Sequence, residues 1–100
     1  MQLIIESPGM APDEQLIRFI QQKFQRLERL YDRILKIVVV LRKEKHNRKK
    51  NCRVEAHVSA PKKLFFSGLQ EEAFEKAAAE VAESLEQQLR RHKTEREEIW

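Results

Sequence analysis

Basic side chains are the residues of this sequence whose number and spacing point most directly to a chemistry. Between residues 42 and 53, seven lysines and arginines stand against a single acidic residue, Glu44, which gives this stretch a net charge of +6. Because the whole chain carries a formal charge of +4, the remaining residues together carry −2. The basic character is therefore local, which is the pattern expected of a surface that meets a polyanion.

The residue types that carry out catalysis or bind metals form no recognisable constellation. His46, His57 and His92 are far apart in the sequence, and none has a partner at a metal-ligand spacing. Cys52 is the only cysteine, which excludes an internal disulfide and a thiolate metal cluster. The chain also has only two glycines, too few for a loop that cradles phosphates. We therefore expect a protein that is not an enzyme and that uses no cofactor, metal or small-molecule substrate.

Further basic residues recur on separate segments, and we predict that the fold brings them into one stripe. Phosphates that bind such a stripe release counterions, so log affinity should fall by about 0.7 to 0.9 per unit of log salt for each phosphate neutralised. Arginines on helices beside a sheet suit recognition of RNA by shape and backbone, as in double-stranded RNA binding domains. The stripe comprises Arg26, Arg29 and Arg33 of a first helix, Lys36 and residues 42–45 of a central strand, and Arg90, Arg91 and Lys93 of a last helix.

The first third of the chain predicts a strand followed by a helix. Leu3-Ile4-Ile5 is a short β-prone run that ends at Ser7-Pro8-Gly9. A proline and an aspartate at residues 12 and 13 suit a helix start, and apolar residues at helical spacing predict about five turns. Lys23 projects within the apolar arc of this helix, so its ammonium must extend past the edge of the core.

Two further strands surround the basic run. Residues 34–41 are nearly all β-branched or aliphatic and favour a central strand. One side of this strand carries Leu35, Ile37, Val39 and Leu41, and the other carries Lys36, Val38, Val40 and Arg42. The basic run that follows has no apolar residue to bury, which predicts an exposed hairpin loop. The next strand alternates cleanly, with Cys52, Val54, Ala56 and Val58 pointing inward.

The last third of the chain predicts a fourth strand over residues 63–66, and Gly68 then releases the chain into a helix from about residue 71 to 96. One side of this helix is apolar, and His92 continues the apolar line into a basic cluster. The residues on that side are Phe74, Ala77, Ala78, Val81, Leu85 and Leu89.

The order of elements is thus β-α-β-β-β-α, which predicts an α+β sandwich in which two helices cover one face of a four-stranded, mostly antiparallel sheet. We expect one domain over residues 1–100, with disorder after about residue 94. Glu6 follows the N-terminal apolar run too closely for a signal peptide, and no apolar run approaches the ~20 residues that span a membrane. We therefore expect a cytoplasmic protein without a membrane partner.

Several short motifs, in the right order over most of the chain, give the sequence a family likeness. It resembles the short ribosome hibernation factors, a family of ribosome-associated translation inhibitors that are also described as sigma-54 modulation proteins. The motifs are Lys23-Phe24, Leu27-Glu28, Asp32-Arg33-Ile34, Val39-Val40-Leu41, Glu44-Lys45, Gln88-Leu89 and His92-Lys93.

The resemblance implies binding to the small ribosomal subunit, in the channel that holds messenger and transfer RNA, during stationary phase or stress. It leaves open whether ribosomes are paired or held as single particles, and it does not give the protein's own oligomeric state. The resemblance implies ribosomal RNA contacts at Lys23, Arg26, Arg33, Lys45, Arg90, His92 and Lys93. The charge pattern alone adds Arg29, Lys36, Arg42, Lys43 and Arg91.

Two other functions fit parts of the sequence. The acidic residues of the last helix, between Glu72 and Glu86, suit a protein-interaction regulator such as a sigma-factor modulator. The basic stripe also suits a general binder of double-stranded RNA. Competition by unrelated RNA duplexes and charge reversal at the end of the last helix distinguish these functions from ribosome binding.

Overall fold

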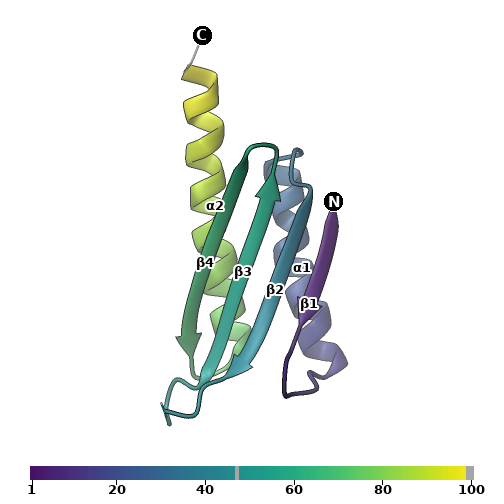
Figure 1. Ribbon diagram of the computed structural model, residues 1–100, viewed down its shortest axis with the longest axis vertical. Coiled ribbons are helices and arrows are strands. Elements are labelled where there is room, and N and C mark those ends of the chain that lie inside the picture. The colour runs from purple at the N-terminus through teal and green to yellow at the C-terminus, as the bar shows by residue number, and fades with distance from the viewer. Residues whose placement is uncertain (47, 99–100) are drawn as a thin grey trace.

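The computed structural model describes the backbone of residues 1–46 and 48–98, and the side chains of residues 1–46 and 48–95. Its elements follow the predicted order, and Figure 1 shows them along the chain. They are β1 (Gln2–Glu6), α1 (Glu14–Leu30), β2 (Lys36–Lys43), β3 (Cys52–Ala60), β4 (Lys63–Glu71) and α2 (Phe74–Glu98).

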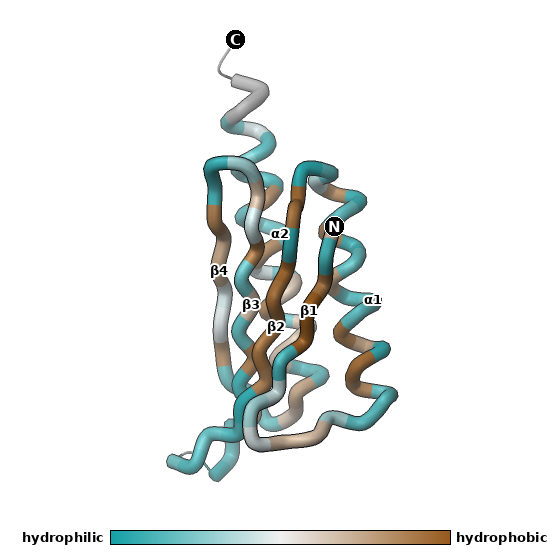
Figure 2. Tube along the Cα trace, turned by 45° about the vertical axis from the view of Figure 1, so that its right-hand side comes forward, coloured by the Kyte–Doolittle hydropathy of each residue, from teal (hydrophilic) through white to brown (hydrophobic). Residues whose placement is uncertain are grey.

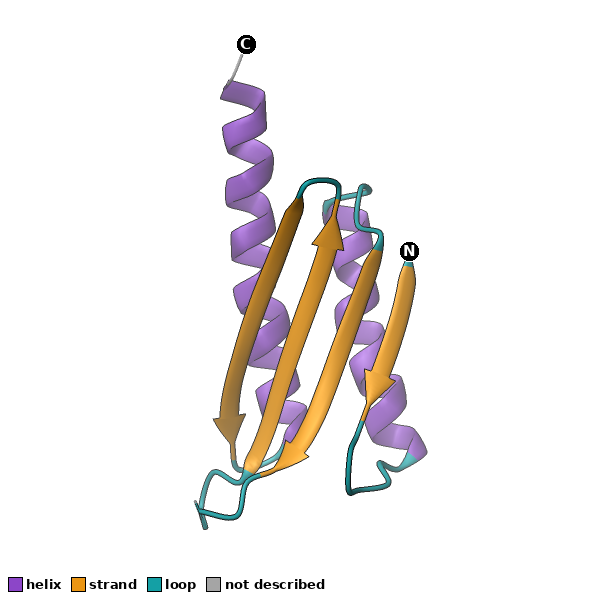
Figure 3. Ribbon diagram, in the orientation of Figure 1, coloured by secondary structure: helices purple, strands orange, loops and turns teal. Residues whose placement is uncertain are grey.

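The four strands form one sheet in the order β1-β2-β3-β4. β1 pairs with β2 in parallel, whereas β3 is antiparallel to both β2 and β4. Parallel neighbours need a long crossover connection, and α1 is that connection. Both helices lie on the same face of the sheet and run in the same direction (Figures 1 and 3). The predicted two-layer α+β sandwich is therefore confirmed.

Local sequence signals explain where α1 begins and ends. The Asp13 carboxylate accepts a hydrogen bond from the backbone N–H of Leu16 at 2.8 Å, which caps the first turn. Glu14 in the first turn and Arg29 in the last turn complement the helix dipole. Tyr31 then takes an extended conformation and ends the helix. The helix buries Leu16, Ile20, Phe24 and Leu27.

The core lies between the sheet and the two helices. Strand β3 is central and alternates as predicted, with Val54, Ala56 and Val58 fully buried. Figure 2 shows the hydrophobic stretches of β1 and β2 side by side, and a hydrophilic connection between β2 and β3 at one end of the sheet. On α2 the predicted apolar side is confirmed, because its residues are buried against the sheet: Phe74, Ala77, Ala78, Val81, Leu85 and Leu89.

The predicted end of the fourth strand is wrong. β4 continues through Gly68 to Glu71, so α2 begins only at Phe74. The cause lies in the neighbouring strand, since the backbone groups of β3 as far as Cys52 need partners, and Cys52 pairs with Glu71. At its other end α2 runs to Glu98, past the point where we expect disorder; residues 99 and 100, to which that expectation also applies, lie outside the described residues.

Two predictions about the segment between α1 and β2 are also wrong. Arg33 does not lie on the first helix, because α1 ends at Leu30 and a turn precedes β2. Leu35 is not part of the strand and does not share the buried side of Ile37 and Val39, since it is 58% exposed and lies just before β2. Ile34, at 4% exposed, takes the buried place instead.

Candidate nucleic-acid interface

A ring contact between Tyr31 and His92 joins the ends of the two helices. Their ring centroids lie 5.6 Å apart, and the rings meet edge to face. Because the helices run in the same direction, this contact sets the last turns of α1 beside the part of α2 around residues 86–93. The contact thereby places basic residues around the end of α1 near basic residues of α2 that lie about sixty positions later in the sequence.

Four exposed cations in this region form what we call the helix cation cluster. None of them makes an ion pair with a side chain in the described part of the protein. By contrast, the guanidinium of Arg90 lies 3.1 Å from the Glu86 carboxylate one turn earlier. Exposed cations without a carboxylate partner are free to form charge-assisted hydrogen bonds with phosphates. The members of the cluster are Arg26, Arg29, Arg33 and Lys93.

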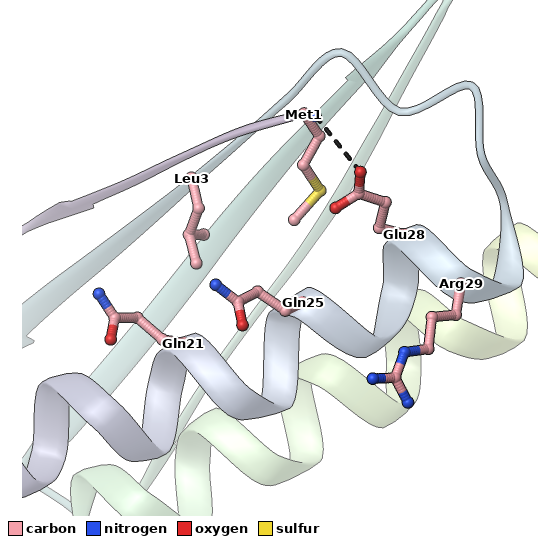
Figure 4. Close-up of a pocket in the computed structure, with 6 residues that line it drawn as sticks. All are labelled: Met1, Leu3, Gln21, Gln25, Glu28 and Arg29. Carbon is pink, nitrogen blue, oxygen red and sulfur yellow. Dashed lines mark hydrogen bonds and ion pairs between the residues drawn. The ribbon is translucent and has the colours of Figure 1, made fainter.

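The two flanks of α1 differ in character. Figure 4 shows the flank beside β1, where Glu28 reaches toward Met1 and Arg29 points away from both. The terminal amine of Met1 donates to the Glu28 carboxylate at 3.4 Å, above a hollow of about 680 Å³. On the outer surface, Arg26 and Arg29 line a second hollow of about 390 Å³. Arg29 thus borders both hollows, and the Glu28 carboxylate in the first is bonded to the terminal amine of Met1.

Lys23 lies on α1 as its position in the apolar arc predicts. The residue is half-buried, and its ammonium sits 5.4 Å from the centroid of the Phe19 ring, one turn earlier. A cation over an aromatic face gains electrostatic energy without an anion, so the stem is buried while the charge stays at the surface.

The basic residues at the end of α2 point to two different sides. Arg91 lines a hollow of about 220 Å³ together with Lys63 and Gln88, on the side of β4. Gln88 fixes that side, because its amide donates to the Phe66 carbonyl at 2.9 Å. Lys93 follows Arg91 by two positions, which is a rotation of about 200° around the helix. Its side chain therefore lies on the side of α1.

His92 faces inward. Its ring lies edge to face with the rings of both Tyr31 and Phe65, the latter at a centroid distance of 5.3 Å. Its Nε2 atom is buried, as is the Tyr31 hydroxyl, and neither has a hydrogen-bond partner within the described residues. The geometry makes His92 a contact between α2, α1 and β4, and a contact with ribosomal RNA stays a prediction for it.

The remaining predicted cations do not join the helix cation cluster, so the prediction of one continuous stripe is wrong. Lys36 and Lys43 stand at opposite ends of β2, about 23 Å apart at 3.3 Å per residue. Arg42 lies on the sheet face opposite the helices and forms an ion pair with Glu55 at 3.2 Å. Lys45 lies in the connection between β2 and β3.

Lys43 is engaged within the protein. Its ammonium lies 5.4 Å from the centroid of the Phe74 ring and 3.6 Å from the Cys52 sulfur. Alternation along β2 turns this side chain toward the helix layer, while Arg42 turns the other way. The basic run around residues 42–45 is thus divided between both faces of the sheet and a loop.

A pair of carboxyl groups lies near the start of α2. A hydrogen bond between them lowers the pKa of Glu71 and raises the pKa of Glu80 from the ordinary value of 4.5. Lys76 and Lys50 lie 3.5 and 3.9 Å from the Glu71 carboxylate and further favour its ionised form. Glu71 ends β4 and Glu80 lies on α2, so the pair lies near the first turns of α2, at the opposite end of the helix from Lys93.

Sequence reasoning placed Arg53 on the outward side of its strand but gave it no role, and it missed Phe66 on the uncovered face of the sheet. Continuing the alternation of residues 63–66 through Gly68 would have placed Phe66 there. Among the described side chains, those of residues 1–46 and 48–95, no group of three or more histidines, cysteines or acidic residues could hold a metal ion. None of the described helices is both long enough and apolar enough to cross a membrane.

Residues 3–97 match the family described as sigma 54 modulation protein / S30EA ribosomal protein. This match covers nearly the whole chain. The chain belongs to the sigma 54 modulation protein / S30EA family. Membership confirms the resemblance in the sequence and makes the protein a ribosome-associated factor of translation regulation. The family is one of ribosome-binding modulation factors and is not an enzyme family.

Solved structures share the fold of this S30EA family member. A ribosomal subunit interface protein from Coxiella burnetii is 21% identical, with a TM-score of 0.82 over 94% of this chain and 99% of that one. The N-terminal domain of Protein Y from Thermus thermophilus is 24% identical, with a TM-score of 0.72 over 91% of this chain and 94% of that one. No curated protein sequence gives a significant match. At these identities the likeness shows a common fold.

Proposed function

We propose that this protein binds the small ribosomal subunit in the channel for messenger and transfer RNA and thereby inhibits translation in stationary phase or stress. The observation that carries the proposal is the helix cation cluster, in which Arg26, Arg29, Arg33 and Lys93 are exposed and have no carboxylate partner among the described side chains. Membership of a ribosome-associated family supports it. Such a protein acts in the cytoplasm, where ribosomes are.

In the proposed mechanism the protein acts by occupying the channel and catalyses no reaction. The packed fold fixes the backbone that carries the cations, so binding of ribosomal RNA phosphates costs rotamer entropy of the exposed side chains but no ordering of the backbone. Contacts to phosphates position a protein on RNA without reading sequence. A domain bound in the channel excludes messenger and transfer RNA because the space is already filled.

Electrostatic binding of this kind has a measurable signature. If the four cations of the cluster each neutralise one phosphate, the slope of log affinity against log salt is about −2.8 to −3.6. Lys23, Lys36, Lys45, Arg90 and Arg91 remain predicted contacts, and each that is made steepens the slope by about 0.7 to 0.9.

Co-sedimentation of the purified protein with small subunits over a salt series tests the proposal. We expect saturable binding at low salt that falls steeply as salt rises, resists an excess of unrelated duplex RNA, and coincides with inhibition of translation in an extract. Failure to co-sediment at low salt would refute the proposal. Competition by unrelated duplexes at equal affinity would instead indicate a general binder of double-stranded RNA.

Charge reversal separates the proposal from a sigma-factor modulator that uses the acidic side of α2. A variant with Arg90→Glu, Arg91→Glu and Lys93→Glu should lose subunit binding while its circular dichroism spectrum stays helical. These three residues are exposed, and the one ion pair that the variant breaks, between Arg90 and Glu86, lies at the surface, where such pairs contribute little to stability. Unchanged activity in this variant would favour the protein-interaction function.

A further inference from the structure

The sheet face that the helices leave uncovered carries an apolar and aromatic row. Cross-strand pairing aligns Ile4, Val38, His57 and Phe66 across all four strands. Neither helix covers this row (Figure 1), and the residue Phe66 is 46% exposed. The rings of His57 and Phe66 lie side by side, with centroids 4.9 Å apart. Exposed aromatic groups that lie together on a small domain mark an interaction surface.

Gly68 makes room for two flat groups beside this row. A Cβ atom at Gly68 would lie 3.0 Å from Arg53 Nη2 and 3.0 Å from Phe66 Cζ. The guanidinium and the aromatic ring therefore both extend over the bare backbone of β4. The Arg53 guanidinium is also held at 3.7 Å from the Glu55 carboxylate. We call the flat groups of Arg53, His57 and Phe66 the sheet platform.

Two basic residues of β2, Lys36 and Arg42, lie beside the sheet platform, toward opposite ends of the strand. Alternation along β2 places Lys36 before Val38 of the apolar row and Arg42 beyond it, both on the same face. Glu55 is offset by Arg42 and Arg53, which lie 3.2 and 3.7 Å from its carboxylate. Lys36, Arg42 and Phe66 also line a common hollow of about 700 Å³.

We propose that the sheet platform binds unpaired RNA by stacking its bases, while Lys36 and Arg42 contact the adjacent phosphates. Aromatic rings and guanidinium planes are the groups on which unpaired bases stack, and a cationic border attracts the backbone. The charge pattern disfavours a second copy of this chain, because Lys36, Arg42 and Arg53 outnumber Glu6 and Glu55 on this face, and a symmetric pair would bring two faces of the same net charge together. A purely apolar partner would leave the buried border charges without counterions.

This proposal goes beyond the proposed function, since it concerns the layer opposite the helices. The helix cation cluster and the sheet platform lie on different faces, so either can bind RNA without the other. The cluster meets phosphates and is sensitive to charge changes. The platform meets bases and is sensitive to the shape of a neutral side chain, Phe66.

A short RNA that reports stacking tests the proposal. The full chain is titrated into an eight-nucleotide single-stranded RNA containing 2-aminopurine, whose fluorescence is quenched when the base stacks. We expect saturable quenching by the natural protein. Phe66→Leu keeps the charge and apolar bulk but removes the ring, so affinity should fall about 5- to 150-fold and the quenching should be lost. Phe66→Trp should retain both.

Two matched variants make the result specific. Leu35→Ala alters an exposed neutral residue, at 58% exposed, that does not line this hollow, and should leave the affinity within about twofold. Gly68→Ala places a methyl group against the movable ends of Arg53 and Phe66, so it should weaken RNA binding with an unchanged circular dichroism spectrum.

Equal quenching by Phe66→Leu and the natural protein would overturn the proposal. So would light scattering that shows a dimer of the natural protein which Phe66→Leu converts to a monomer, because the face would then be an interface between copies. If the natural protein gives no quenching but still co-sediments with small subunits, the sheet platform alone is refuted. Quenching without co-sedimentation refutes only the proposed function.

Discussion

Neutralising one cation on each helix of the helix cation cluster gives the sharpest test of how this protein binds the ribosome. The variant carries Arg26→Gln and Lys93→Gln, one substitution on α1 and one on α2. Both residues are exposed, and neither forms an ion pair with a described side chain. The substitutions therefore remove phosphate contacts while leaving the core and the ion pairs in place.

The expected magnitude follows from counterion release. Each lost phosphate contact reduces the slope of log affinity against log salt by about 0.7 to 0.9, so two contacts reduce it by about 1.4 to 1.8. At 0.1 M salt, one decade below a 1 M reference at which the electrostatic contribution vanishes, the affinity falls by the same number of log units, about 25- to 60-fold. That loss corresponds to about 2 kcal/mol of binding free energy.

The control variant carries Arg18→Gln and Lys76→Gln, with the same change of charge on the same two helices but near their first turns. The guanidinium of Arg18 lies 3.2 Å from the Glu14 carboxylate, and the ammonium of Lys76 lies 3.5 Å from the Glu71 carboxylate. Binding of fluorescent protein to small subunits is measured between 50 and about 500 mM salt.

The control should keep most of its affinity, within about threefold of the natural protein, and most of its slope. Equal losses in the two variants would mean that net charge alone drives binding. An unchanged affinity and slope in the test variant would remove the helix cation cluster from the interface.

Three predictions concern stability and are checked by urea unfolding. His92→Ala removes two edge-to-face ring contacts and should cost about 1 to 3 kcal/mol of unfolding free energy, most of which His92→Phe restores. Leu85→Ala creates a cavity at a fully buried position and should cost about 2 to 5 kcal/mol. The raised pKa of Glu80 means that its stabilising contribution is present below pH 4.5 and is lost as the pH rises through that raised value. Glu80→Gln keeps a hydrogen-bond donor for Glu71 without a titrating proton, so its unfolding free energy should fall less than that of the natural protein between pH 4.5 and 7.

Each of these three predictions would be contradicted by a specific result. If His92→Ala leaves stability intact but weakens ribosome binding, the ring acts on RNA and not on packing. An unfolding free energy for Leu85→Ala within 1 kcal/mol of the natural value would contradict the tight packing of α2 on the sheet. Parallel pH profiles for Glu80→Gln and the natural protein would show that the two carboxyl groups do not share a hydrogen bond in solution.

The sequence predicted the elements well where one local period governs a segment. Residues 52–59 alternate strictly and form β3, and the apolar side of α2 is buried as expected. The errors fall at element ends, where pairing with a neighbour outweighs local preference. β4 passes through Gly68 because β3 offers it backbone partners, and α1 ends before Arg33 because Tyr31 turns away.

The site was predicted as a set of residue types but not as a surface. Charge and motif identified the basic residues of the helix cation cluster, and the ring contact between Tyr31 and His92 places the end of α1 beside the part of α2 that carries Lys93. The predicted continuation through Lys36 and residues 42–45 is wrong, because β2 carries those residues to its two ends and to both faces. Sequence reasoning also placed His92 at the RNA surface, whereas its ring lies inward against two other rings.

The sequence by itself determined the order of the elements, the sides of the helices that pack, and the type of partner that the local charge favours. Those features depend on composition and on periods of two or 3.6 residues, which are local properties. Only the tertiary structure decided which cations share a surface and which flat side chains meet over Gly68. These arrangements depend on strand register and helix direction, which are set by contacts between residues far apart in the chain.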